Sequence, residues 1–393
     1  MTTTGTDIFA TLAANRQQPS EMIDQMVDHF RQSRQPMELF EALKMRVRNQ
    51  LGLPLVASED EGMHAEDAER QLEAGLLDAC REAGTMLIQD GRIAEGWMYL
   101  RPTGDKDLVR QLVKDIEITD DNFDDMVQVL LHEEIDVGRG YQAVLDHQGT
   151  CPSITMYEQT LSQRGKPARQ AAASRLLAQL YNELVTLVRN DIAQRESPAA
   201  PDESLADMIA SRRWILDEGG YHLDTTHLSA TVRIATVLDD REDWQKAWEL
   251  TQYGRRLNHQ FQYPGDEPFV DFYPAYSAYY STLLGDDVDA GLKYFQRKAK
   301  SVDVMEFGTA AIETYVDLLD RVGQHDEAIK MAIQLVPSDV PSQRIVPMLI
   351  EIAQRANAAG SSDAFDPVLQ YCADREDVLG YAAVLHAANA STA

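Results

Sequence analysis

Cysteine is scarce in this chain of 393 residues: Cys80, Cys151 and Cys372 are the only three, and they lie far apart. No two of them have the C-x-x-C spacing of a zinc ribbon or a redox motif. So few cysteines, so widely separated, also argue against a disulfide framework. We therefore expect neither disulfides nor structural zinc, and we expect Cys80 and Cys372 to be small core residues of apolar helices.

Long apolar runs are absent as well. A membrane-spanning helix needs roughly 20 consecutive apolar residues, and no window of the sequence approaches that length. Residues 1–7 have neither the basic region nor the apolar region of a secretory signal. These absences predict a cytoplasmic protein that does not associate with a membrane.

Basic residues are too few to balance the acidic ones. The chain has 36 Lys and Arg against 64 Asp and Glu, which gives a formal net charge of −28. A field of this sign repels the phosphates of nucleic acids and of anionic membranes. We expect no nucleic-acid partner, and we expect any partner steered by charge to be basic. The simplest effect of the charge is to keep a long surface hydrated.

Strand-forming patterns are almost absent, whereas helical periodicity runs through most of the chain. Between residues 171 and 192, Leu177, Leu180, Leu184 and Val188 fall on one face of a helix. This segment predicts the longest helix, with shorter helices before and after it. The predicted fold class is therefore all-α.

Four segments share one local pattern, in which a turn containing Gly or Asp is followed by a helix with a small residue at a fixed place. The small residues are Gly96, Ala247, Gly291 and Ala328, each three positions after a larger residue. A small side chain at this place lets two antiparallel helices approach closely. Helix pairs of this kind stack into α-solenoids, whose surfaces bind other molecules.

Two of these segments resemble the tetratricopeptide repeat (TPR), and residues 231–257 and 276–299 look like more divergent copies. Residues 312–337 match the repeat best, through Ile312, Tyr315, Leu319, Gly323, Ala328, Ala332 and Pro337. Residues 80–100 are similar, through Ala83, Gly84, Leu87, Gly91, Gly96 and Leu100. The resemblance implies helical hairpins stacked as an α-solenoid, in one or two halves, and a general binding role.

Two stretches are predicted to separate domains. Residues 53–62 form a polar, acidic connector, and Pro198 and Pro201 interrupt the helical pattern because neither can occupy a helix interior. The predicted division is an N-terminal helical unit over residues 1–56, a helical domain with one TPR-like hairpin over 63–195, and a C-terminal TPR-like repeat domain over 203–393.

Two groups of residues would suit an all-α metal-dependent enzyme. Acidic strings at 120–124 and 239–243 resemble the paired motifs with which prenyl-diphosphate synthases bind magnesium, although the basic residues of that family are missing. In the loop at 219–227, His222, Asp224 and His227 could hold a metal ion or act as acid and base. Helix caps and turns explain the same residues. We therefore predict no metal ion and no cofactor, and favour a non-catalytic role.

Aromatic residues concentrate between residues 253 and 280, together with arginines. Such side chains anchor protein interfaces because they bury a large area with few rotatable bonds. The helical spacing of Tyr276, Tyr279 and Tyr280 is typical of a core, and packing of the preceding loop against the helices is an equal alternative to partner binding. The predicted partner-binding residues are Tyr253, Arg256, Phe261, Tyr263, Phe269, Phe272 and Tyr273.

A small basic island at residues 164–169 precedes the long helix. Positive charge is unfavourable at the start of a helix. Arg164, Lys166 and Arg169 are therefore expected to meet acidic groups, either on a partner or, more simply, within the chain at residues 115–136.

The function that fits these patterns best is non-catalytic protein–protein interaction or scaffolding, with a protein or peptide bound at an aromatic-lined repeat surface. Two alternatives stay open. An all-α enzyme would bring its carboxylates or histidines together in one enclosed pocket. A self-assembling structural subunit would expose a large apolar face on the terminal helices at 342–389.

Overall fold

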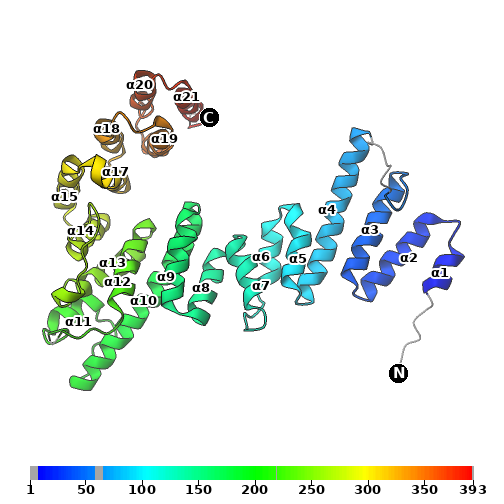
Figure 1. Cartoon of the computed structure of the whole chain (residues 1–393), viewed down its shortest axis with the longest axis horizontal. Helices are drawn as coiled ribbons and strands as arrows, with labels where there is room; N and C mark the ends of the chain where they lie inside the picture. Colours follow the sequence, from blue (N-terminus) through cyan, green and yellow to red (C-terminus); the bar gives the residue numbers. More distant parts are fainter. Residues whose placement is uncertain (1–7, 58–64, 218, 392–393) are drawn as a thin grey trace. The chain divides into compact units, whose positions relative to one another are not determined.

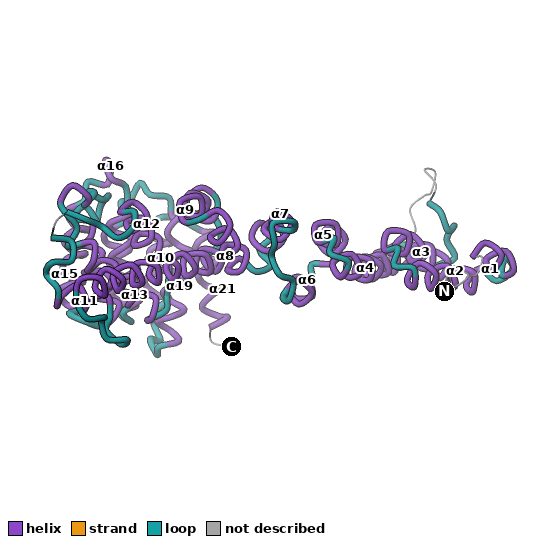
Figure 2. The backbone as a smooth tube through the Cα atoms, turned by 90° about the horizontal axis from the view of Figure 1, so that it is seen from below, coloured by secondary structure: helices purple, strands orange, loops and turns teal. Residues whose placement is uncertain are grey.

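The computed structural model describes residues 8–57, 65–217 and 219–391. Within these ranges every regular element is a helix, and no β-strand is present (Figure 2). The predicted all-α fold class is therefore confirmed. Packing divides the chain into two compact units, Met1–Ser153 (unit 1) and Ile154–Ala393 (unit 2). In the described ranges no helix combines the length and the apolar character needed to cross a membrane.

Unit 1 contains helices α1 to α8 and the start of α9 (Figure 1). Helices that follow one another in the chain pack together, α2 on α3, α3 on α4 and α4 on α5. Pro19 and Pro36 stand at the starts of α2 and α3, where the missing N–H of proline costs nothing. The helices are α1 (Ile8–Ala14), α2 (Pro19–Gln32), α3 (Pro36–Gln50), α4 (Glu66–Gln89), α5 (Ile93–Leu100), α6 (Lys106–Val113), α7 (Phe123–Val127), α8 (Val137–Gln148) and α9 (Thr150–Gln159).

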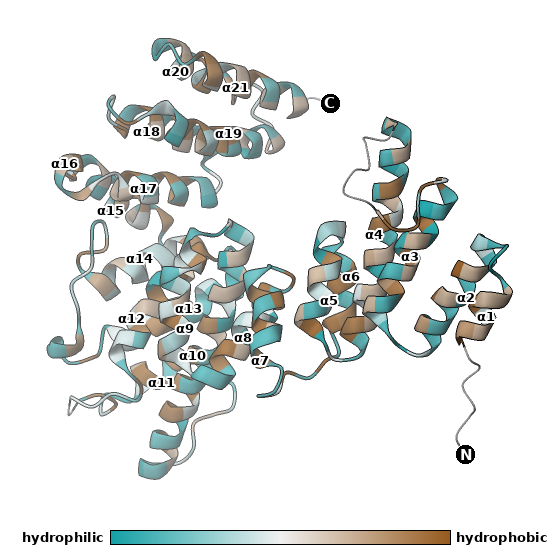
Figure 3. Ribbon diagram, turned by 45° about the vertical axis from the view of Figure 1, so that its right-hand side comes forward, coloured by the Kyte–Doolittle hydropathy of each residue, from teal (hydrophilic) through white to brown (hydrophobic). Residues whose placement is uncertain are grey.

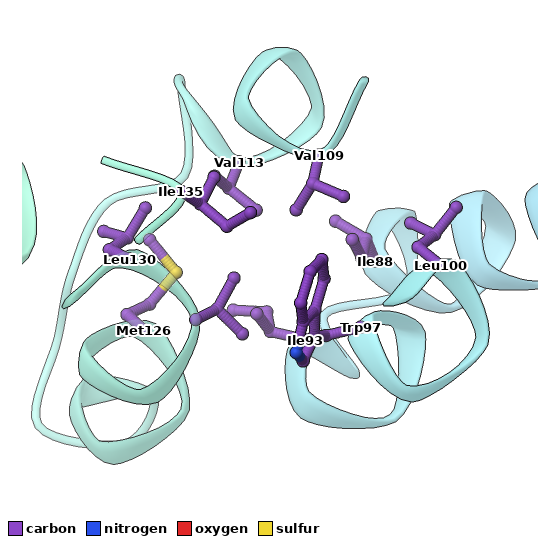
Figure 4. Packing of buried hydrophobic residues seen from close by; sticks show 10 residues of the cluster. Ile88, Ile93, Trp97, Leu100, Val109, Val113, Met126, Leu130 and Ile135 are labelled. Atoms are coloured by element: carbon purple, nitrogen blue, oxygen red, sulfur yellow. The ribbon is translucent and has the colours of Figure 1, made fainter. Parts of the chain in front are cut away.

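A buried apolar cluster joins α4, α5, α6 and α7 within unit 1. Side chains from all four helices point into it (Figure 4). The buried members are Ile88, Ile93, Trp97, Leu100, Val109, Val113, Met126, Val129, Leu130 and Ile135. Helix α4 also contributes Ala79 and Met86 to a second buried cluster with α2 and α3, so it joins two parts of unit 1.

Unit 2 is built around α10, the longest helix of the described chain, as the sequence predicted. The predicted stripe of α10 is buried, since its four members are each at most 1% exposed. Apolar and polar residues are interleaved along the helices, as expected where each has one buried face (Figure 3). The further helices are α11 (Leu205–Ser211), α12 (Thr225–Ile234), α13 (Arg241–Gly254), α14 (Phe272–Leu284), α15 (Val288–Ser301), α16 (Val304–Phe307), α17 (Ala310–Arg321), α18 (His325–Leu335), α19 (Ser342–Ala358), α20 (Asp366–Asp374) and α21 (Val378–Ser391), after α10 (Lys166–Arg195).

The four predicted turn-and-helix segments each lie in a packed helix pair: α4 with α5, α12 with α13, α14 with α15 and α17 with α18. Three of the turns use a glycine in the left-handed backbone region, where other residues are strained: Gly91, Gly285 and Gly323 have φ values of +80°, +87° and +81°. The small residues of the pattern are all buried. The prediction of closely packed helix pairs is therefore confirmed for these four.

The division into two units falls within α9, whereas the sequence placed domain limits at 56, 63, 195 and 203. Pro198 and Pro201 follow the end of α10, but the chain there stays attached to unit 2. Arg189 of α10 donates hydrogen bonds to the carbonyl oxygens of Ala200, Pro201 and Glu203, at 2.9, 3.1 and 2.7 Å. A break in helical pattern here ends a helix without ending a unit. Residues 58–62 of the predicted connector lie outside the described residues.

Candidate functional site

A cleft of about 690 Å³ opens on unit 2. Its walls come from the start of α10, the 3₁₀ turn Ala235–Val237 (η4), the turn into α13, and helices α14, α17 and α19. Helices distant in sequence therefore supply one surface. Its titratable side chains are those of Lys166, Arg169, Asp239, Tyr279, Glu313, Asp317, Asp320, Arg321, His325, Glu351 and Arg355.

Arg321 of α17 lies at the base of this cleft, with only 12% of its side chain exposed. It donates a hydrogen bond to the carbonyl oxygen of Leu238 (2.9 Å), and its Nη2 is 3.5 Å from Asp239 Oδ1. Its Nε is 2.9 Å from Asp317 Oδ2, an ion pair in which the N–H does not point at the oxygen. Burial lowers the pKa of Arg321, but Tyr279 and the two carboxylates outweigh it and raise that pKa. Arg321 thus stays charged. It attaches helix α17 to the turn that precedes α13.

Asp239 is shared between Arg321 and α10. Its Oδ2 accepts a hydrogen bond from Gln170 Nε2 and lies 2.7 Å from Lys166 Nζ. Burial raises the pKa of Asp239, but the interactions with Lys166, Gln170 and Arg321 prevail and lower it below its usual value. The carboxylate is therefore ionised at neutral pH and holds three segments of the wall together.

Asp320 makes a second ionic group deeper in the same wall. Its side chain is 8% exposed, and its oxygens lie 2.7 Å from His325 Nδ1 and 2.7 Å from Arg355 Nη2. This carboxylate links α17, α18 and α19. Arg321 and Asp320 are adjacent in sequence and serve different partners, so two ionic groups stiffen the wall on which the cleft lies.

Partly exposed carboxylates and cations both line the cleft. The side chains of Glu313, Asp317 and Glu351 are 40%, 44% and 68% exposed. Each of these carboxylates lies near an arginine: Glu313 is 2.8 Å from Arg344, Asp317 is 2.9 Å from Arg321, and Glu351 is 3.9 Å from Arg355. The side chains of Lys166 and Arg355, which also line the cleft, are 50% and 48% exposed. A bound molecule therefore meets exposed groups of both charges, with the carboxylates held in ion pairs.

Four of the seven predicted partner-binding residues make contacts inside unit 2: three are buried aromatic residues, and the fourth is an arginine hydrogen-bonded to the main chain. Tyr253 and Tyr273 are 0% and 1% exposed, and Phe272 is 9% exposed. Arg256 donates hydrogen bonds to main-chain carbonyl oxygens of the segment after α11, including that of Arg213 at 2.7 Å. Burial raises the pKa of Tyr253 to about 12, which keeps its hydroxyl neutral. In this conformation these side chains pack in the core or fix a loop, and they present no open aromatic surface.

The other three predicted residues lie in the loop before α14. Tyr263 is 42% exposed, whereas Phe261 and Phe269 are half-buried. Phe269 stacks on Tyr276, with ring centroids 3.9 Å apart, and it also lines the cleft. Of the seven, Phe269 is the one that the structure brings to the cleft, and partner binding by Tyr263 and Phe261 stays a prediction.

The structure gives His222 and Asp224 separate hydrogen-bonding roles. His222 Nε2 lies 3.3 Å from Asp191 Oδ2, while its Nδ1 lies 2.9 Å from the hydroxyl of Tyr253. Asp224 caps α12, accepting from the backbone N–H groups of Thr226 and His227. The hydrogen bond from the Thr226 hydroxyl, more than any other contact, lowers the pKa of Asp224. Across the part of the chain that the structure describes, no group of three or more His, Cys, Asp or Glu side chains is placed to hold a metal ion.

The two acidic strings belong to different units and have different roles. In unit 1, Asp120 Oδ1 lies 3.5 Å from His147 Nε2. In unit 2, Asp240 caps α13 by accepting from the N–H of Glu242 at 2.8 Å, and Asp239 joins the ion pairs described above. The second string acts as a turn and cap, as its place in the repeat pattern predicted.

No protein-family model matches the chain, and neither a curated protein nor a solved structure is significantly similar to it. The resemblance to the TPR is therefore not supported by a match to a family model. The described residues form helices that pack on their neighbours, without strands.

Proposed function

We propose that this chain is a TPR-like α-solenoid protein that binds a partner protein non-catalytically, and that the cleft of unit 2 takes a short segment of that partner. The observation that carries the proposal is the cleft itself, a hollow of about 690 Å³ whose wall is fixed by two ionic groups. Pockets of about 300–1,000 Å³ suit small ligands or a few side chains better than a folded surface. A rigid wall also lowers the ordering cost of binding.

The partner segment is expected to be basic. The whole chain carries a net charge of −28, and Glu313, Asp317 and Glu351 line the cleft with partly exposed carboxylates for which a cationic segment would compete with their arginine partners. Such a field attracts cationic segments and speeds their association. Phe269 supplies an aromatic surface inside the cleft, on which the aliphatic part of Lys or Arg can pack.

A peptide-binding experiment tests this proposal. Fluorescent decapeptide pools with three fixed Lys residues are titrated with wild-type protein and with the double variant Glu313→Gln/Glu351→Gln. Glu351 is 68% exposed, and a Gln at position 313 still offers an oxygen to the Thr309 hydroxyl, so both substitutions are compatible with the fold. The double variant loses two exposed ion pairs with Lys residues of the peptide. At about 0.2–1 kcal/mol for each pair, binding is expected to weaken by about two- to thirtyfold.

The matched control is Glu306→Gln/Asp202→Asn, which removes the same charge at exposed positions that do not line the cleft. It is expected to bind the Lys pools nearly as well as wild type. Equal losses in both double variants would show a general charge effect. Absence of binding by every Lys pool would refute the proposal.

Self-assembly is a second candidate, because one observation favours it. Helix α21 has no charged side chain, and Val378, Leu379 and Leu385 are 77%, 79% and 42% exposed. This is the feature expected of a self-assembling subunit. Sedimentation velocity over a hundredfold concentration range tests it: a mass that rises with concentration, and does not rise in Leu379→Lys, supports assembly, whereas a constant monomer mass excludes it. For the enzyme alternative, the two acidic strings lie in different units, and His222, Asp224 and His227 do not line the cleft.

A further inference from the structure

Arg169 stands where two hollows of unit 2 meet. It lines the cleft described above, and it also lines a smaller hollow of about 360 Å³ beside it. The two hollows share Arg169, Thr236 and Val237. Arg169 therefore borders a surface longer than the cleft alone.

The other cations of these hollows are paired with carboxylates. Lys166 Nζ lies 2.7 Å from Asp239, and Arg233 Nη2 lies 2.6 Å from Glu158. The guanidinium groups of Arg321 and Arg355 are engaged as described above. Among the described residues, no carboxylate pairs with Arg169, and its Nε–H is buried without a partner. The group that feels its charge is the Tyr157 hydroxyl, whose pKa Arg169 lowers against the larger effect of burial.

This arrangement is unfavourable for the fold on its own. Arg169 is the fourth residue of α10, close to the positive end of the helix dipole, where another positive charge is destabilising. A buried N–H without an acceptor adds a desolvation cost. An incoming oxyanion would remove both costs, because it supplies an acceptor and neutralises the charge.

We propose that Arg169 is a recognition residue that binds a carboxylate of the partner segment. A planar guanidinium presents parallel N–H groups that match a carboxylate. A phosphate dianion fits less well, since Asp239 and Glu158 line the same two hollows and repel a double charge more strongly. The assignment rests on the proposed function and specifies its partner: a segment with basic residues for the mouth of the cleft and one acidic residue for Arg169.

Three sets of the Lys-containing pools test the assignment, differing only in one scanned position that holds Glu, Gln or phosphoserine. Wild-type protein is expected to bind the best Glu pool about tenfold more tightly than the matching Gln pool. Arg169→Gln should bind both alike, at the affinity of wild type for the Gln pool. Arg175→Gln, an exposed position on the same helix, should keep the tenfold preference.

A preference for Glu that persists in Arg169→Gln, or no preference in wild type, would overturn the assignment. A phosphoserine pool that binds best, and only when Arg169 is present, would replace carboxylate by phosphate and also overturn it. If no pool binds, the proposed function fails. The anion site is then tested separately by adding glutarate at constant ionic strength and measuring the melting temperature. Glutarate must raise the melting temperature of wild type more than that of Arg169→Gln.

Stability gives an independent readout. Arg169→Met keeps an unbranched side chain and removes the uncompensated charge and the buried N–H. Its melting temperature is expected to exceed that of wild type in the absence of peptide, while Arg175→Met stays unchanged. A lower melting temperature for Arg169→Met would mean that Arg169 supports the fold, contrary to the proposal.

Discussion

Replacement of Gly96 by Ala tests whether the small residue of the repeat pattern sets the distance between paired helices. Gly96 lies on α5, against α4. A Cβ at this position would stand 2.5 Å from Ile88 Cγ1, 2.9 Å from the carbonyl oxygen of Gly84 and 3.0 Å from the backbone N of Ile88. Two of these three atoms belong to the main chain, so no change of rotamer can relieve the contact.

Two opposing effects set the size of the expected loss. Gly→Ala in a helix interior ordinarily stabilises by about 0.5–1 kcal/mol, because Ala loses less backbone entropy. Overpacking of a tight contact costs about 1–3 kcal/mol, and fixed backbone atoms place this site in the upper part of that range. The net expectation is a loss of about 1–2 kcal/mol, or about 2–8 °C in the melting temperature of a unit of this size.

Urea unfolding of the full chain, followed by far-ultraviolet circular dichroism, measures the change. Met98→Ala is the control, since Met98 is on the same helix and 72% exposed, and it should shift stability by less than about 0.5 kcal/mol. Gly84→Ala should behave like Gly96→Ala, because its Cβ would meet Leu100 Cγ at 2.7 Å. A Gly96→Ala variant as stable as wild type would refute the reasoning, since α4 and α5 could then separate without cost.

Two further predictions concern unit 2. Arg321→Met should cost about 2 kcal/mol in urea unfolding, because it leaves Asp239, Asp317 and the Leu238 carbonyl short of a partner, while Arg175→Met should cost little. Burial raises the pKa of Tyr157 and of Tyr253 to about 12, whereas unfolded tyrosine ionises near pH 10. The resulting stability is complete below about pH 10 and is lost as the pH rises towards 12, at up to about 2.7 kcal/mol per tyrosine. Circular dichroism should therefore show unfolding together with tyrosine ionisation, and ionisation near pH 10 without unfolding would contradict this.

The fold was predictable wherever local pattern alone decides the structure. The stripe of α10 and the turns at Gly91, Gly285 and Gly323 depend on residues within one or two helical turns, so periodicity and backbone preference were sufficient. The division into units was not predictable in this way. Helix α10 ends just before Pro198 and Pro201, as expected, but hydrogen bonds from Arg189 and the packing of α11 on α13 keep the following chain in unit 2.

The aromatic residues show why the site was harder to predict than the fold. Tyr253 and Tyr273 are of a residue type that is common at protein interfaces. Residue type alone cannot distinguish an aromatic side chain that contacts a partner from one that packs on the next helix. The cleft, in turn, depends on pairs far apart in sequence, such as Arg321 with Asp239. Its one local signal was Asp317 with Arg321, four residues apart on one helix face.

The excess of acidic residues makes an unpaired arginine such as Arg169 informative. With 64 acidic residues and 36 basic ones, many carboxylates must remain without a cation, so an unpaired Asp or Glu says little about function. An unpaired guanidinium is different, because acidic partners are in excess throughout the chain. In the basic island at 164–169 the sequence suggested pairing within the chain, and Lys166 does pair, although with Asp239 rather than with residues 115–136. Arg169 does not pair with a carboxylate of the described chain. A carboxylate of the proposed partner would accept its hydrogen bonds.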